Sequence, residues 1–168
     1  CPNNCVFCNQ RTISGHGDFK IDGVRDEIDQ ALSTLSADTE REIAFFGGSF
    51  TGIERELMIA LLELAEEYVR AGRVSEIRLS TRPDYIDAEI LSILSRYSVR
   101  TVELGLQSLD DRVLSASRRG HDRLCALDNF ELSTDRVDAV DNVVVDGEIK
   151  LRRGFGKEKN IPCAHVDI

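Results

Sequence analysis

The regular alternation of short apolar runs with amphipathic stretches is the feature that most constrains the fold of this chain. Strands are predicted at residues 43–46, 76–84 and 101–108, and helices at 21–35, 54–72, 87–97 and from 109 onward. Asp87 is a predicted helix N-cap and Gly72 a predicted helix end. Strand and helix repeat at intervals of about 25 to 33 residues, which is typical of βαβ units and a parallel sheet with right-handed crossovers.

In such a sheet the functional loops follow the carboxyl ends of the strands. The three predicted strands lead into the segments GGSF, STRP and LQS, so these segments are expected at one edge of the sheet. After His121 the alternation is predicted to stop. A hairpin with its turn at Asp146-Gly147 is expected there, followed by a basic, glycine-containing loop or loose tail.

Length and charge limit the functions that this chain can have. Its 168 residues predict one domain, or most of one, and its net charge of −9 disfavours a broad electrostatic contact with nucleic acid. No apolar run approaches the roughly 20 residues that span a bilayer, and no signal peptide is visible. A cytoplasmic location is therefore expected. Because the first residue is Cys1, we expect a fragment, or the ordered part of a longer chain.

Three of the five cysteines, Cys1, Cys5 and Cys8, lie in the first eight residues with the spacing C-x3-C-x2-C. An odd number of thiols favours a ligand set over disulfides. A zinc site is one alternative, with His16 as the fourth ligand. A redox pair of Cys5 and Cys8 is another. A [4Fe-4S] cluster held by three thiolates, with one iron left open for a further ligand, is the interpretation that the spacing favours.

Four ordered motifs resemble the radical S-adenosylmethionine (SAM) enzymes. They are the cysteine loop CPNNCVFC, the glycine-rich segment FFGGSFTG, the third-strand segment LSTRPD and the fourth-strand segment ELGLQSLDDRVLSASRRGH. The likeness covers about residues 1–121 and is greatest to the branch of the Elongator catalytic subunit and oxygen-independent coproporphyrinogen oxidase. It implies a partial TIM-type (βα) barrel, here a truncated radical SAM core (1–121) with an atypical tail (122–168). The strand that would precede the cysteine loop is not expected within this chain.

The resemblance also implies cofactors and the residues that bind them. Cys1, Cys5 and Cys8 would hold a [4Fe-4S] cluster whose open iron binds SAM. Contacts with SAM would come from the second, third and fourth strands of the family fold and the turn after them: Gly47, Gly48, Ser49, Phe50, Ser80, Gln107 and Arg119. A guanidinium such as that of Arg119 suits the SAM carboxylate because it can donate two hydrogen bonds.

The implied activity is the reductive cleavage of SAM to a 5′-deoxyadenosyl radical, with electrons from a reductant such as flavodoxin or ferredoxin. The implied substrates are a tRNA, for RNA modification, or a small molecule such as a tetrapyrrole. No membrane partner is expected, and self-association is expected if the tail leaves a sheet edge uncovered. The alternative function is a non-catalytic metal-binding domain, holding zinc or an iron-sulfur cluster for structure or electron transfer.

Overall fold

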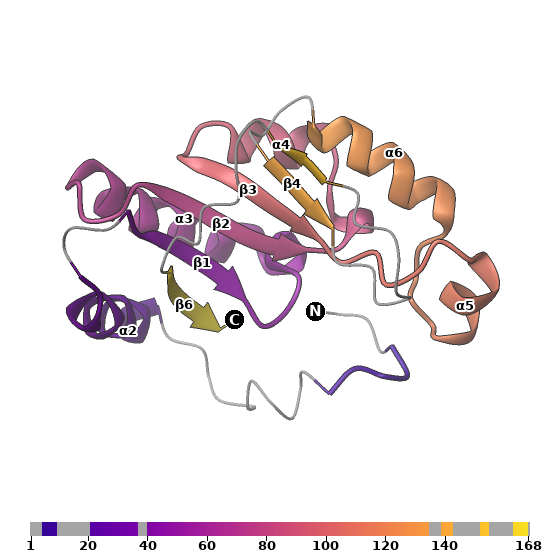
Figure 1. Ribbon diagram of the computed structural model, residues 1–168, viewed down its shortest axis with the longest axis horizontal. Helices are drawn as coiled ribbons and strands as arrows, with labels where there is room; N and C mark the ends of the chain where they lie inside the picture. Colours follow the sequence, from indigo (N-terminus) through magenta and orange to yellow (C-terminus); the bar gives the residue numbers. More distant parts are fainter. Residues whose placement is uncertain are drawn as a thin grey trace.

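The computed structural model describes residues 5–9, 21–36, 40–134, 139–142, 152–154 and 163–167. Its helices are α2 (Ile21–Thr34), α3 (Arg55–Arg70), α4 (Ala88–Leu94), α5 (Asp111–Ala116) and α6 (Arg123–Thr134), with short 3-10 turns η1 (Phe50–Gly52) and η2 (Pro83–Tyr85). Its strands are β1 (Glu42–Phe46), β2 (Glu76–Thr81), β3 (Val99–Leu104), β4 (Ala139–Asn142), β5 (Arg152–Gly154) and β6 (Cys163–Asp167). The described strands form one sheet in the order β5-β4-β3-β2-β1-β6 (Figure 1).

The predicted parallel sheet is confirmed at its centre. β1 pairs in parallel with β2, and β2 pairs in parallel with β3. A helix links each strand to the next, α3 between β1 and β2 and α4 between β2 and β3. The fold class is therefore α/β, and the carboxyl ends of the three strands lie along one edge of the sheet.

The predicted ends of two helices are also confirmed. Gly72 follows α3 with a φ of 67°, and the amide of Arg73 donates to the Tyr68 carbonyl at 3.0 Å, a Schellman motif. At the start of α4, the Asp87 carboxylate accepts from the amide of Ile90 at 2.7 Å. Within the described part of the chain, no helix combines the length and the apolar character that crossing a membrane requires.

The central sheet has one apolar face and one polar face. Ile43, Ile77 and Val99 lie in register across β1, β2 and β3, and all three are buried in the hydrophobic core. Side chains alternate between faces along a strand, so the neighbouring positions point to the other side. There Arg78 forms ion pairs of 2.9 Å with both Glu42 and Glu103, which joins the three strands across the polar face.

The prediction that strand and helix cease to alternate after His121 is wrong. α6 follows at Arg123–Thr134, and β4 then extends the sheet in parallel with β3, with Thr101 opposite Ala139. The sequence pattern missed α6 because its apolar residues do not mark one face: Leu124 is 66% exposed, whereas Ala126 is fully buried.

The last two described strands lie at opposite edges of the sheet. β5 pairs antiparallel with β4, which confirms the pairing of the predicted hairpin, although its Asp146-Gly147 turn lies outside the described residues. β6, which the sequence pattern did not predict, lies beside β1 (Figure 1). The two strands pair in parallel, with Phe45 opposite Val166. In a consecutive βα order, a strand preceding the cysteine loop would take this position beside β1.

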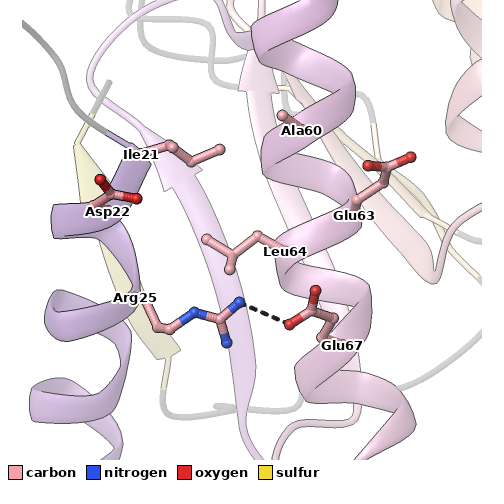
Figure 2. A pocket seen from close by; sticks show the side chains of 7 residues that line it. All are labelled: Ile21, Asp22, Arg25, Ala60, Glu63, Leu64 and Glu67. Atoms are coloured by element: carbon pink, nitrogen blue, oxygen red, sulfur yellow. Dashed lines mark hydrogen bonds and ion pairs between the residues drawn. The ribbon is translucent and has the colours of Figure 1, made fainter.

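Helix α2 packs beside α3 over a groove of about 440 Å³, shown in Figure 2. An ion pair of 2.8 Å between Arg25 and Glu67 crosses the groove. In the same helix contact, the Tyr68 hydroxyl donates to the Asp29 carboxylate at 3.0 Å. These contacts attach α2 to the central unit, and α2 in turn contacts β6.

Candidate functional site

Hydrogen bonds join the loops that leave the three central strands. The hydroxyls of Thr51, after β1, and Thr81, at the end of β2, share a hydrogen bond of 2.6 Å. The amide of Gly105, after β3, donates to the carbonyl of Thr81 at 2.8 Å. The three loops therefore form one connected surface at the carboxyl edge, where the sequence pattern placed the chemistry.

The glycine-rich turn after β1 combines an unusual backbone with a buried anchor. Gly47 has a φ of 90°, a conformation that side-chain-bearing residues rarely adopt. Gly48 continues the turn, Ser49 is buried, and the Phe50 ring stacks on Phe45 with centroids 4.6 Å apart. Phe50 thus holds the turn against the core.

The described part of the cysteine loop packs against the end of α5. The amide of Val6 donates to the Ser117 carbonyl at 3.1 Å, and the amide of Cys8 donates to the Cys5 carbonyl at 3.0 Å, which closes a turn. The Cys5 thiol is buried, whereas Cys8 is exposed, and both thiols are free. Cys1 lies outside the described residues. Among the residues that are described, no group of three or more Cys, His, Asp or Glu side chains is arranged to hold a metal.

Two arginines converge on the Cys5 sulfur. The Nη1 atom of Arg82 lies 3.7 Å from Sγ, and the Nη1 atom of Arg119 lies 3.6 Å from it. Both arginines are buried. A guanidinium stays protonated in proteins, so the pair places positive charge beside a sulfur that would carry negative charge as a thiolate ligand. This donor set fits an anionic, thiolate-bound group.

Arg82 is held by the residues that follow it. Its Nε and Nη2 atoms donate to the two oxygens of Asp84 at 2.8 and 2.6 Å. Burial is the largest single influence and would lower the pKa of Arg82, but Asp84, with smaller contributions from Cys5 and Tyr85, raises the pKa above its ordinary value. Its Nη2 also donates to the Arg119 carbonyl. The LSTRPD motif contains this residue, but the resemblance assigned only Ser80 from it.

Arg119 and Gln107 meet at Gly105. Arg119 Nη2 donates to the Gly105 carbonyl. A Cβ added at Gly105 would lie 3.1 Å from Arg119 Nη2 and 3.6 Å from Gln107 Nε2. Gln107 has a φ of 71°, rare for a residue other than glycine, and such backbone is often found at functional sites. Two predicted SAM contacts therefore lie side by side.

Ser80 lies on the polar face of the sheet, opposite Glu103 in the register of β2 and β3. It shares that face with the ion pairs of Arg78, which sequence reasoning missed. Burial is the main influence on Glu42 and raises the pKa of its carboxyl group, against the lowering influence of Arg78. The sequence analysis did not assign a role to four further residues of this edge: Thr51, Thr81, Asp84 and Gly105. All four lie within the motifs that resemble the family, and this position is the only feature of the sequence that points to them.

Fold and site together define a βα protein with a thiol loop and cationic side chains at the carboxyl edge of its sheet. The family model of the radical SAM superfamily matches residues 1–149. This chain belongs to the radical SAM superfamily.

Proteins of similar sequence support the same family. A putative methylthiotransferase of Methanocaldococcus jannaschii is 28% identical over 141 residues, covering 80% of this chain and 30% of that protein. The oxygen-independent coproporphyrinogen-III oxidase-like protein HemZ of Bacillus subtilis is 27% identical over 156 residues, covering 87% of this chain and 30% of that protein. The chain thus spans under a third of the length of these two relatives.

A solved structure shares the fold. The archaeal Elp3 of Methanocaldococcus infernus, with an N-terminal deletion, matches with a TM-score of 0.58 at 22% identity. The match covers 73% of this chain and 33% of that structure. This likeness and the family match confirm the predicted α/β partial radical SAM core.

Proposed function

We propose that this chain holds a [4Fe-4S] cluster on Cys1, Cys5 and Cys8 and cleaves SAM reductively. With the cofactors bound, an electron from a reductant such as flavodoxin or ferredoxin would break a C–S bond of SAM, giving methionine and a 5′-deoxyadenosyl radical. The observation that carries the proposal is the convergence of Arg82 and Arg119 on the buried Cys5 sulfur.

The other residues of the edge would bind and orient SAM. The turn of Gly47 and Gly48 would let the backbone approach the amino group. Arg119, whose Nη2 donates to the Gly105 carbonyl and whose Nη1 faces Cys5, would donate to the carboxylate of SAM. Gln107, whose left-handed backbone supports a functional role, would contact SAM from the same side. Ser80 would contact it from β2.

The test is anaerobic reconstitution with iron and sulfide, followed by addition of SAM and dithionite. We expect about four irons per chain, as for a single [4Fe-4S] cluster, and formation of 5′-deoxyadenosine measured by mass spectrometry. Cys5→Ala should lose the cluster. Cys125→Ala, a matched variant of a free cysteine in α6, should retain both iron and product.

Two results would contradict the proposal in different ways. A fully loaded protein that never forms 5′-deoxyadenosine would be a non-catalytic metal-binding domain. A protein that binds zinc in place of iron would contain a structural zinc site. An electron paramagnetic resonance spectrum that changes on addition of SAM would support the open iron.

The proposed substrates are those of the resemblance, a tRNA or a tetrapyrrole. Binding energy from the correct substrate can be used to accelerate the chemical step, here the cleavage of SAM. Adding tRNA or a porphyrinogen to the loaded protein and measuring the rate of 5′-deoxyadenosine formation would separate these two classes.

A further inference from the structure

Arg82 connects three segments that are distant in the sequence. It follows the last residue of β2, and its guanidinium contacts Cys5 in the cysteine loop, Asp84 in η2 and the Arg119 carbonyl after α5. Only 2% of Arg82 is exposed. A buried arginine with partners in three segments is held in a fixed orientation.

The nitrogens of the Arg82 guanidinium contact different partners. Nε and Nη2 donate to the Asp84 carboxylate, which leaves Nη1 as the nitrogen that faces the Cys5 sulfur at 3.7 Å. The Tyr85 ring lies 5.4 Å from the guanidinium carbon and covers one face of the group. Asp84 therefore orients Arg82, and Arg82 directs a positive charge at Cys5.

A buried charge at this distance influences the electron affinity of a thiolate-bound cluster. Reduction adds one negative charge to the cluster, and a positive charge held nearby in a poorly solvated site favours the reduced form. Hydrogen bonds to cluster sulfurs and local charge are general determinants of cluster potentials. Arg118, which follows α5 and is exposed, is screened by solvent. Its charge should influence the reduction potential much less.

We propose that the charge of Arg82 raises the reduction potential of the cluster bound through Cys5, and that the charge of Asp84 moderates this effect by partly neutralising that of Arg82. The inference rests on the proposed function for the presence of the cluster, but not on SAM cleavage. It predicts opposite effects for the removal of the two partners.

The test is a reductive titration of the reconstituted, SAM-free protein, followed by electron paramagnetic resonance. Arg82→Gln should lower the ratio of reduced to oxidised cluster at a given potential about tenfold, which is a shift of the midpoint of about 59 mV in the negative direction for a one-electron couple. Asp84→Asn should shift the midpoint in the positive direction. Arg82→Lys keeps the charge but loses the planar guanidinium. Its midpoint should therefore stay closer to that of the unaltered protein than the midpoint of Arg82→Gln does. Arg118→Gln is the matched control and should not change the midpoint.

The measured midpoints either uphold or overturn the proposed role of Arg82. Equal midpoints for the unaltered protein, Arg82→Gln and Asp84→Asn would overturn the inference, and so would an Arg82→Lys midpoint as low as that of Arg82→Gln. If Arg82→Gln fails to fold or to load iron, the direction of the Asp84→Asn shift decides. Shifted midpoints without 5′-deoxyadenosine would uphold the role of Arg82 and overturn only SAM cleavage. A chain that loads no cluster overturns both proposals.

Discussion

Gly105 determines how closely the Arg119 guanidinium approaches the end of β3. Arg119 Nη2 donates to the Gly105 carbonyl, and a methyl group at Gly105 would lie 3.1 Å from that nitrogen. Contacts this short are avoided by movement of the more flexible partner, here the end of the arginine side chain. The absence of a side chain at Gly105 is thus a local requirement for the position of Arg119.

Gly105→Ala should therefore weaken SAM binding without removing the cluster. We expect the dissociation constant for SAM to rise about tenfold, equivalent to about 1.4 kcal/mol, because Arg119 must move away from its present position. Anaerobic equilibrium dialysis with reconstituted protein would measure it, with iron content determined in parallel. Gly23→Ala in α2 is the control, since an added Cβ there meets nothing within 4 Å. An unchanged dissociation constant would show that Arg119 does not contact SAM.

Helix α5 is capped by hydrogen bonds at both ends. At its start, the Asp110 carboxylate accepts from the Arg112 amide at 2.9 Å and pairs with the Arg112 guanidinium at 2.7 Å. At its end, Arg118 has a φ of 54° and the amide of Arg119 donates to the Leu114 carbonyl at 2.9 Å. This second turn directs Arg119 inward and presents the Ser117 carbonyl to the cysteine loop.

The N-terminal cap predicts how stability depends on acid. The side chain of Arg112, followed by its backbone amide, lowers the pKa of Asp110 from 3.8 to about 2. A depressed carboxyl pKa stabilises the folded state above pH 3.8, and this contribution is lost as the pH falls from there through about 2.

Urea unfolding of the unaltered protein and Asp110→Asn between pH 6 and pH 2 would measure this dependence. The difference in the free energy of unfolding between the two proteins should be constant near pH 6 and should disappear as the pH approaches 2. In an Arg112→Gln background the pH-dependent part should shrink, because the arginine is its main cause. A difference that is independent of pH would contradict the assignment.

Pattern reasoning identified most of the central elements but not α6. The strands β1, β2 and β3 are apolar runs bounded by turn residues, and α3 has its apolar residues on one face, so local sequence predicts them. In α6, Leu124 is exposed and Ala126 buried, because the helix packs mainly on η2 and β4. Its helical state therefore depends on tertiary contacts that periodicity does not reveal.

β6 extends the sheet and its core at the outer side of β1. Ala164 and Val166 of β6 are fully buried in the same core as Ile43 and Phe45 of β1. α2 covers this strand. A strand from the end of the described chain thus completes the core on which the glycine-rich turn is anchored through Phe45 and Phe50.

Val166→Ala should destabilise the protein by about 2 kcal/mol, because it removes buried apolar surface from this core. Val113→Ala in α5 is the matched control, since Val113 is 44% exposed, and its effect should stay within about 0.5 kcal/mol. Thermal or urea unfolding of both variants would measure the difference. Equal effects of the two substitutions would show that β6 does not contribute to the folded core in solution.

Short-range patterns determined the alternating βα order, the helix caps at Gly72 and Asp87, and the thiol motif with its family resemblance. These features depend on neighbours within one or two turns of the chain, so the sequence displays them directly. Only the tertiary structure decided that Arg82 and Arg119, 77 and 114 residues from Cys5, converge on its sulfur. It also decided that β6 pairs with β1. Such contacts depend on how whole strands align and pack, and no local pattern encodes that alignment.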